Sequence, residues 1–459
     1  LAVLDALRAA ADINLNLNKD RKTDMTAETY FTRRDGGEYA YTIEATKLKF
    51  GVGAIGEVGH DAKALGMTRV ALYTDARVAK LEHVAVAARA LRDAGLDVEI
   101  YDAVEVEPTD RSFLAGAQFA REGNFDGFVS VGGGSVMDTA KASNLYSTYP
   151  ADLLTYVNLP VGQAQPVPGP LKPHIACPTT FGTASECTGM AIFDILDMEM
   201  KTGIAHRELR PTLGIIDPAA LTTLPNMVVA ANAFDVFSHA IESLTARPYT
   251  ERPAPDRPEL RPMLQGANPY SDIACSEAIR LIGANIERAM KEPDDVSARE
   301  PLMFAGMLAG IGFGNSGCHV PHAMSYAVAG LVRDYHPEGW PDDHAMVPHG
   351  ISVIVNAPAV FRLIGPSAAG RHLRAAEAMG ADIRNIPDER AGEVLADQVI
   401  QLMRATGMPN GLSGVGYSDA DIEALTDRTL PQKRLLDIAP RDISRADLSQ
   451  LFKDSMRYW

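Results

Sequence analysis

The sequence predicts two domains, an α/β domain built on a parallel sheet and an all-helical domain that follows it. The chain has 459 residues, more than one ordinary domain contains. Strand-like and helix-like segments alternate from about residue 47 to 220, and long segments with helical spacing of apolar residues follow from about 225 onward. We place the boundary between residues 222 and 223, where nearby prolines interrupt the pattern.

The predicted α/β domain, residues 25–222, opens with two strand segments that flank a helix. Residues 69–75 (RVALYTD) and 96–102 (LDVEIYD) are short and apolar, which is typical of buried strands. Residues 110–123 predict an amphipathic helix, and residues 126–135 predict a strand that enters a glycine turn. Strands that alternate with helices indicate a parallel sheet joined by crossover helices.

The predicted helical domain, residues 223–459, contains long stretches in which apolar residues recur at helical spacing. The clearest are 228–245, 272–291, 297–312 and 388–406. Residues 247–269 break the pattern, because their six prolines exclude a regular helix. This segment is either a disordered insert or an ordered functional loop.

Residues 1–24 form an N-terminal extension that we exclude from the fold prediction and that is possibly not native. Residue 1 is Leu, and the segment contains four aspartates and no serine, which fits neither a signal peptide nor a transit peptide. Met25 is a candidate natural start. We expect a cytoplasmic protein, or one of the mitochondrial matrix if a presequence has been removed.

The composition excludes several classes of protein. A formal net charge of −16 argues against nucleic-acid binding, since no basic stripe is present to neutralise phosphates. The four cysteines form no C-x-x-C pair, which argues against a disulfide framework or a cysteine zinc site. We find no long uncharged apolar stretch and therefore expect no membrane span.

The glycine turn at the end of the predicted strand 126–135, in the segment VSVGGGSVMDTAKA, is a candidate phosphate-binding site. Gly133, Gly134 and Ser135 lie between a strand and a helix, where glycines allow backbone N–H groups to approach a phosphate. Asp138 falls in the first helical turn, within reach of ribose hydroxyls or a nicotinamide. The alternative is a tight turn without a ligand. The alternating strands and helices favour the phosphate-binding interpretation.

Two further segments could contribute to a dinucleotide site. Gly51, Gly53 and Gly56 match G-x-G-x-x-G, which alone is often a plain turn. Asp75 ends the next strand, where a carboxylate binds adenine-ribose hydroxyls and repels a 2′-phosphate, so it favours NAD over NADP.

The segment CPTTFGTASECTG, residues 177–189, is the third candidate for the nucleotide site. Thr179, Thr180 and Thr183 place small hydroxyls around a glycine, as in a pyrophosphate or nicotinamide pocket. A polar turn between strands is an equally good interpretation of this segment taken by itself.

Histidines and an aspartate in the helical half predict a metal site. Asp235 and His239 are four residues apart on one face of a predicted helix. His319 and His322 lie on another helix, and His349 follows a proline. One aspartate and three histidines from three elements suit Fe(II), Zn, Co or Ni and leave an open coordination position. Each residue alone is more often structural, so the prediction depends on the combination.

Taken in order, these motifs resemble the iron-dependent (group III) alcohol dehydrogenases. The matching segments are FGVGA, GGGSVMDTAK, PTTFGTASE, FDVFSHAIES, GCHVPHAMSY and VPHG, from about residue 47 to the C-terminus. The resemblance implies a Rossmann-like domain joined to a helical metal-binding domain, the fold shared with dehydroquinate synthase. It implies that the metal ligands are Asp235, His239, His322 and His349. It implies that the cofactor NAD is held by Asp75, Gly133, Gly134, Ser135, Asp138, Thr179, Thr180 and Thr183.

One position departs from the family pattern. Many members have a second histidine four residues after His322, and this chain has Tyr326 there. Tyr326 could replace that histidine as a hydroxyl relay, or no side chain is needed. We predict His322 and Tyr326 as the catalytic pair.

Within that family, the sequence is similar to the hydroxyacid–oxoacid transhydrogenases. The similarity lies in Tyr326 and in the segments VEPTD, LKPHIACPTTFGT and RPMLQGANPYSD. The similarity implies hydride transfer from 4-hydroxybutyrate to 2-oxoglutarate through bound NAD, with a divalent metal, Fe(II) or Zn, polarising the substrate oxygen. The products are succinate semialdehyde and D-2-hydroxyglutarate. Because the proline-rich segment is part of the match, we expect it to be ordered. We expect a homo-oligomer, a dimer or higher.

Both substrates are carboxylates, so a cation should lie in the cleft. The candidates are Lys201, Arg207, Arg210, Arg252, Arg257, Arg261 and Arg333.

Two alternative functions stay open. One is an ordinary NAD-dependent alcohol dehydrogenase with an exchangeable cofactor. The other is a non-redox lyase of the dehydroquinate synthase type, which needs a denser set of basic phosphate ligands near its metal.

Overall fold

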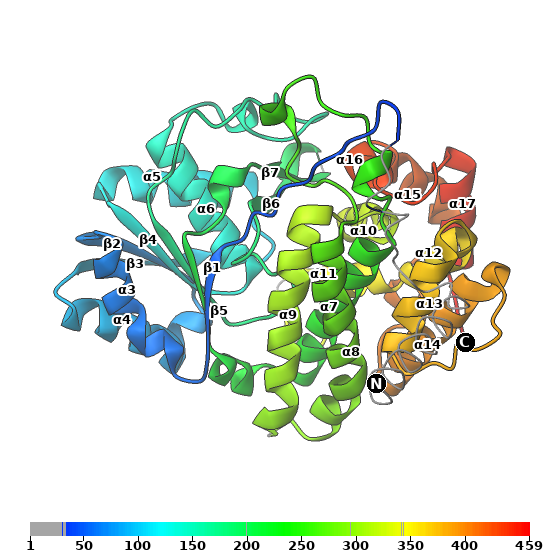
Figure 1. The fold of residues 1–459 in the computed structure, drawn as a ribbon. Coiled ribbons are helices and arrows are strands. Elements are labelled where there is room, and N and C mark those ends of the chain that lie inside the picture. The colour runs from blue at the N-terminus through cyan, green and yellow to red at the C-terminus, as the bar shows by residue number, and fades with distance from the viewer. Residues whose placement is uncertain (1–29, 31–33, 199, 294, 341, 343) are drawn as a thin grey trace, which may run out of the picture.

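The computed structural model describes residues 30, 34–198, 200–293, 295–340, 342 and 344–459. The extension expected at residues 1–24 lies outside this part of the chain. Figure 1 shows the first half of the chain wound around a sheet and the second half packed beside it as helices. The predicted division into an α/β part and a helical part is confirmed.

Six strands in the described residues form one parallel sheet, in the order β1-β8-β5-β4-β2-β3. They are β1 (Lys47–Phe50), β2 (Arg69–Asp75), β3 (Asp97–Val104), β4 (Gly127–Gly132), β5 (His174–Pro178) and β8 (Leu213–Ile216). The accompanying helices are α3 (Val58–Ala64), α4 (Glu82–Asp93), α5 (Asp110–Gly123) and α6 (Gly134–Thr148). The strands predicted in the sequence correspond to β2, β3 and β4.

Alternate residues of β2 build two separate cores on the two faces of the sheet. Val70 and Leu72 pack in a cluster with residues of α3 and α4. Ala71 and Tyr73 pack on the other face, in a cluster with residues of α5 and α6. Side chains of a strand point alternately to opposite faces, and helices that cover both faces keep a parallel sheet buried.

The carboxyl edge of the sheet brings the predicted nucleotide-binding segments together. Gly132 of β4 and Pro178 of β5 are register partners. The glycine turn that follows β4 and the threonines that follow β5 therefore leave the sheet side by side. In open parallel sheets, ligands bind outside this edge.

An antiparallel hairpin, which the sequence analysis did not predict, follows the threonines. It consists of β6 (Met190–Ile195) and β7 (Met200–Ala205). Alternate residues of β6 are buried, and Asp194 lies opposite Lys201 across the pair.

The helical part is built on three long helices, α7 (Asn226–Thr245), α8 (Pro269–Lys291) and α9 (Val296–Ser316). These correspond to three of the four helices predicted from apolar spacing, and the fourth corresponds to α14. The other helices are α10 (Val320–Gly330), α11 (His349–Ile354), α12 (Ala357–Ile364), α13 (Ala369–Ala378), α14 (Ala391–Ala405), α15 (Ile422–Thr429), α16 (Lys433–Leu436) and α17 (Arg445–Asp454).

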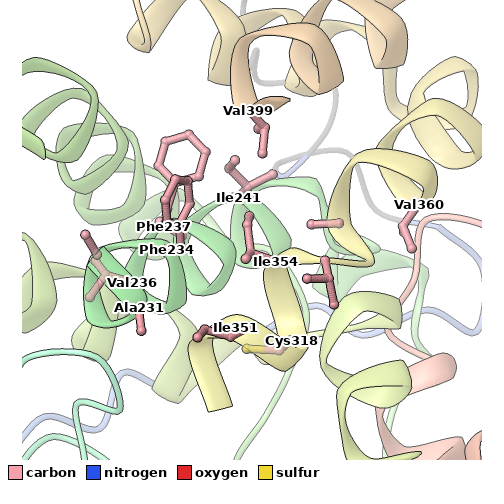
Figure 2. Close-up of a cluster of buried hydrophobic side chains, with 14 of the residues drawn as sticks. Ala231, Phe234, Val236, Phe237, Ile241, Cys318, Ile351, Ile354, Val360 and Val399 are labelled. Atoms are coloured by element: carbon pink, nitrogen blue, oxygen red, sulfur yellow. The ribbon is translucent and has the colours of Figure 1, made fainter. Parts of the chain in front are cut away.

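Helix α7 is the centre of the helical core, and almost all of its residues are buried. Figure 2 shows Phe237 and Ile241 of α7 in one cluster with Ile354 of α11 and Val399 of α14. A helix that is apolar on all sides is expected inside a domain. Polar residues on this helix therefore stand out as candidates for function.

One stretch, His349–Ala378, is long and apolar enough to cross a membrane by length and composition. The structure divides it into α11, α12 and α13. Of its most apolar window, 72% is buried inside the protein, as in a core segment, so it is weak evidence for a membrane span.

The proline-rich segment 247–269 is folded, as expected. It contains the 3-10 turns Tyr249–Glu251 and Pro258–Leu260, and a bridge pairs Pro248 with Ala267. Its Leu264 reaches the cavity described below.

We predict that Phe237→Ala lowers the free energy of unfolding by about 3–5 kcal/mol, because it removes a fully buried ring and leaves a cavity. Denaturant unfolding of the variant measures this loss. Leu260→Ala, at a side chain that is 54% exposed, is the control and should change the free energy of unfolding by less than about 0.5 kcal/mol. Equal effects of the two substitutions would contradict the assignment of α7 as the centre of the core.

Candidate active site

A cavity of about 490 Å³ is lined by residues of both domains. All of the metal, cofactor and catalytic residues that the family resemblance implied line this cavity. They are Asp75, Gly133, Gly134, Ser135, Asp138, Thr179, Thr180, Thr183, Asp235, His239, His322, Tyr326 and His349.

The four predicted metal ligands converge on one point. Asp235 and His239 lie one turn apart on α7, His322 comes from α10, and His349 is the first residue of α11. Asp235 Oδ1 lies 3.6 Å from His239 Nδ1, 3.6 Å from His322 Nε2 and 3.7 Å from His349 Nε2. One ligand atom from each residue lies within 4.8 Å of all the others.

The geometry of this group fits a divalent cation. Asp235 Oδ1, His239 Nδ1 and His322 Nε2 are buried and have no hydrogen-bond partner in the described part of the chain. Buried polar atoms without partners are rare because they cost free energy. Metal bonds of about 2.1 Å in tetrahedral arrangement separate ligand atoms by roughly 3.4 Å, close to the spacings observed here. Fe(II) and Zn both accept such a donor set.

The electrostatics of the group also suit a cation. Burial alone would raise the pKa of Asp235, but the neighbouring His239, His349 and His322 lower it to about 2. Burial lowers the pKa of His239 to about 3, so its imidazole is neutral. An ionised carboxylate and a neutral imidazole are the forms that bind metal.

A second buried carboxylate, which the sequence analysis missed, orients one of the imidazoles. Glu242 Oε1 lies 2.6 Å from His322 Nδ1, and Glu242 Oε2 accepts the backbone N–H of His319 at 2.7 Å. Burial would lower the pKa of His322, but Glu242 and Asp235 raise it to about 9. Without a metal this ring therefore carries a proton on each nitrogen, and a cation bound at Nε2 would displace that proton and leave the one on Nδ1 bonded to Glu242. The signal in the sequence is spacing, since Glu242 follows His239 by three residues on the same helix face.

His319, the other histidine on this segment, belongs to the core. Its Nε2 pairs with Thr245 Oγ1 at 2.9 Å, and its Nδ1 accepts the backbone N–H of Val320 at 2.9 Å. It caps the N-terminus of α10. Of the two histidines, His322 alone joins the metal-binding group.

The glycine turn forms a close cradle at the N-terminus of α6, where no side chain caps the helix. A Cβ on Gly134 would lie 2.7 Å from the side chain of Thr183, and one on Gly133 would lie 3.3 Å from that of Thr180. Both threonines line the cavity. The turn thus presents backbone N–H groups, a helix dipole and hydroxyls together, which suits a pyrophosphate.

The two aspartates of the predicted nucleotide site differ in their bonding. Asp75 Oδ1 accepts the N–H groups of Arg77 and Val78, both at 2.9 Å, and its Oδ2 accepts no hydrogen bond in the described residues. Asp138 is engaged through both oxygens, by the Ser185 hydroxyl at 2.5 Å and the N–H of Ile192 at 2.9 Å. Asp75 therefore has an oxygen available for a ribose hydroxyl.

The glycines of the G-x-G-x-x-G segment do not line the cavity. The N–H groups of Gly53 and Ile55 instead donate to the carboxylate of Asp217, at 3.0 and 3.2 Å. This turn is structural, which was the alternative interpretation of the pattern.

Of the seven cations considered for the substrate carboxylate, Lys201 alone lines the cavity. It donates to Glu107 at 2.6 Å and to Asp194 at 3.0 Å, so its charge is already matched. The other six lie away from this cavity and bond to carboxylates or backbone carbonyls: Arg207, Arg210, Arg252, Arg257, Arg261 and Arg333.

Arg434 of α16, which the sequence analysis did not consider, also lines the cavity. It is half-buried, and no hydrogen bond or ion pair joins it to a described residue. Burial raises the pKa of the Cys318 thiol, and Arg434 acts on it in the opposite direction, so the two groups are close. Cys318 Sγ lies within 4.8 Å of ligand atoms of Glu242 and His322. Arg434 is therefore a guanidinium near the metal-binding group.

Tyr326 lies one turn after His322 on α10 and is half-buried. Its hydroxyl has no hydrogen-bond partner among the residues that the structure describes. Tyr326 and Arg434 also line a small adjoining recess, so the two side chains are neighbours.

We predict that Glu242→Gln lowers divalent-metal affinity by about 10- to 100-fold. Glu242 accepts from two N–H donors, whereas a glutamine amide has only one acceptor oxygen, so one donor would be left unsatisfied. Calorimetric titration of the metal-free protein with Zn²⁺ measures this affinity. Glu277→Gln on the exposed side of α8 is the control. Unchanged metal affinity in Glu242→Gln would contradict the orienting role.

Comparison with known proteins identifies relatives for both halves of the chain. Residues 45–218 match the family model "Iron-containing alcohol dehydrogenase", and residues 263–456 match "Fe-containing alcohol dehydrogenase family, C-terminal". The mitochondrial hydroxyacid-oxoacid transhydrogenase of Bos taurus is 46% identical over 424 residues, which cover 92% of this chain and 91% of the relative. The Homo sapiens protein of the same name is also 46% identical over 424 residues, with the same coverage.

Solved structures share the fold. A 1,3-propanediol oxidoreductase is 28% identical, with a TM-score of 0.79 over 91% of this chain and 100% of that chain. A sulfoacetaldehyde reductase from Bifidobacterium kashiwanohense, solved in complex with NAD+, is 21% identical, with a TM-score of 0.74 over 91% of this chain and 99% of that chain. By sequence and by fold, the chain belongs to the iron-containing alcohol dehydrogenase family and is an oxidoreductase.

Proposed function

We propose that this protein is a hydroxyacid–oxoacid transhydrogenase. Hydride passes from 4-hydroxybutyrate to 2-oxoglutarate, and the products are succinate semialdehyde and D-2-hydroxyglutarate. The observation that carries the proposal is the meeting, in one cavity, of a metal-binding group, a nucleotide-binding turn and an unpaired guanidinium. The transhydrogenase names of the relatives at 46% identity support it.

NAD and a divalent metal are the proposed cofactors. The turn at Gly133 and Gly134 would hold the pyrophosphate, and Asp75 would hold the adenine ribose. The metal would be held by the group centred on Asp235. When bound, NAD supplies the hydride acceptor and donor, and the metal supplies a Lewis acid for the substrate oxygen.

The protein residues then have three tasks in this proposal. Glu242 keeps the His322 ring in one orientation through the bond to Nδ1. The Tyr326 hydroxyl, which has no partner in the described residues, is suited to relay the proton of the substrate hydroxyl toward solvent. The apolar and aromatic walls, which include Phe313 stacked on His239 with ring centroids 3.9 Å apart, restrict water.

Arg434 is the proposed ligand of the substrate carboxylates. A guanidinium binds a carboxylate through two parallel hydrogen bonds, and such charge-assisted bonds are strong. Lys201 is a poorer candidate because Glu107 and Asp194 already neutralise it. One unpaired cation suits this reaction, since both the hydroxy acid and the oxo acid carry a carboxylate and occupy the cavity in turn.

The lyase alternative is less well supported. A dehydroquinate synthase-type reaction needs several basic ligands for a substrate phosphate near the metal. Among the described residues that line the cavity, the cations are the paired Lys201, Arg434, and Arg77 beside Asp75.

The expected location and assembly stay predictions. We expected either a cytoplasmic protein or one of the mitochondrial matrix. The relatives named above are called mitochondrial, which favours the matrix.

We predict that metal-loaded protein, charged with NAD and then desalted, converts 4-hydroxybutyrate and 2-oxoglutarate into equal amounts of the two products without added NAD. Chiral liquid chromatography with mass spectrometry measures both products. Protein treated with a chelator is the control and should be inactive. No product from the substrate pair without added NAD, together with oxidation of 4-hydroxybutyrate when NAD is added, would instead support an ordinary alcohol dehydrogenase.

We predict that Arg434→Gln raises KM for 2-oxoglutarate by about 10- to 100-fold, the value expected when a hydrogen-bonded charge pair is lost. A small neutral aldehyde, reduced with added NADH, should keep its KM because it has no carboxylate. The matched control is Lys433→Gln, which removes the neighbouring, exposed charge on α16. Equal effects of Arg434→Gln on the charged and neutral substrates would exclude carboxylate binding.

A further inference from the structure

A second cavity, of about 240 Å³, lies at the other end of β5 from the nucleotide-binding threonines. His174, the first residue of β5, lines this cavity, whereas Thr179, just after the last residue, lines the first cavity. A strand rises about 3.3 Å per residue, so roughly 16 Å of strand separates these two residues. The two cavities are therefore distinct.

The second cavity is lined mainly by cations. Among the described residues they are Lys141, Lys172, Arg207 and Arg210. Glu208 is the one carboxylate in the same lining, and the neutral polar residues are Asn144, Thr212 and His174. Burial, together with the charge of Lys141, lowers the pKa of His174 to about 3, so this ring is neutral.

The N–H groups of these cations outnumber the protein oxygen atoms that accept hydrogen bonds from them. The Arg210 side chain is 8% exposed, and its Nε has no hydrogen-bond partner in the described part of the chain. Arg210 Nη1 shares the carboxylate of Glu44 with Arg207, at 3.5 and 3.4 Å. Lys172 Nζ has neither a hydrogen bond nor an ion pair within the described residues. Glu44 thus serves two guanidinium groups, and Lys172 forms no ion pair in the described residues, although the charge of Asp126 acts on it.

Lys141 forms the wall between the two cavities. Its side chain is fully buried, and Nζ donates to Ser185 Oγ at 2.5 Å and to the carbonyl of Met190 at 2.8 Å. Asp138 lies 3.6 Å away but is already bonded to Ser185 and to the N–H of Ile192. Burial lowers the pKa of Lys141, the carboxylates of Asp138 and Glu186 act against that lowering, and the charge of Arg210 adds to it. Lys141 is therefore paired with Asp138, and it meets a like charge, Arg210, in the lining of the second cavity.

Like charges around one cavity cost free energy, and an anion in the cavity would offset that cost. The net charge of the whole chain is −16, so a general excess of basic residues does not explain the cluster. We propose that this second cavity binds a small multivalent oxyanion, a phosphate or a di- or tricarboxylate. Guanidinium groups bind both chemistries through paired hydrogen bonds, and the cavity volume suits a molecule of this size.

The test is calorimetric titration of the metal- and NAD-loaded protein, at low ionic strength, with phosphate, pyrophosphate, succinate and citrate. NAD occupies the glycine turn in this form, so an added phosphate cannot bind there. We expect binding of at least one trivalent anion, and the ranking of pyrophosphate against citrate identifies the preferred chemistry. No binding of any of the four anions at millimolar concentration would overturn the proposal.

Variants locate the bound anion. Arg207→Gln combined with Lys172→Gln removes two cations that contact neither the nucleotide cleft nor the metal-binding group, and should weaken binding by at least about tenfold. Arg257→Gln combined with Lys63→Gln is the matched control, because it removes two exposed charges elsewhere. Unchanged NAD affinity and melting temperature confirm that the variants are folded, and the single variant Arg207→Gln provides a milder test. Loss of anion binding in Arg434→Gln but not in the double variant would place the anion in the first cavity and overturn the proposal.

Discussion

Three polar side chains on one buried helix are the constraint on which the structure depends. Asp235, His239 and Glu242 share one face of α7, and the rest of that helix is packed in the core of the helical domain. An ionised carboxylate buried without a partner costs several kcal/mol, so each of these groups must be compensated. Glu242 is compensated by His322 Nδ1 and a backbone N–H. Asp235 Oδ1 has no such partner, and a bound cation would satisfy it together with three imidazoles.

This requirement determines how the surrounding helices pack. Helices α10 and α11 must each place a histidine within bonding distance of the same point. Gly350, which follows His349, lets α11 approach α7 closely, since a Cβ there would lie 2.0 Å from the carbonyl oxygen of Ala231. The close approach is therefore part of the metal-binding geometry, and a larger residue would move His349 away from Asp235. The packing of α11 on α7 and the position of the ligand His349 therefore depend on each other.

The sequence predicted the parts of the site that are encoded locally. The Asp-x-x-x-His spacing, the glycine turn and the threonines are each a short motif, and each lies where its motif indicated. Glu242 was missed because its only signal, a spacing of three residues from His239, is shared by many glutamates that bind no histidine. The β6–β7 hairpin was missed because residues 196–199, which join its strands, contain no glycine, proline or asparagine to signal a turn. Arg434 could not be found from the sequence, because its importance comes from the absence of an ion-pair partner, which only the folded chain shows.

The contrast between Lys201 and Arg434 explains how an acidic protein would bind the anionic substrates proposed above. Charges separated by more than about 8 Å are screened at physiological ionic strength, so the net charge of −16 has little effect inside a cavity. What matters there is whether a cation has its own carboxylate. Lys201 has two, Glu107 and Asp194, and presents no net positive charge to a ligand. Arg434 has none in the described residues, so a substrate carboxylate gains its full attraction without displacing another acid. In the proposed function, the number of unpaired charges in the cavity, and not the net charge of the chain, would therefore determine which substrates bind.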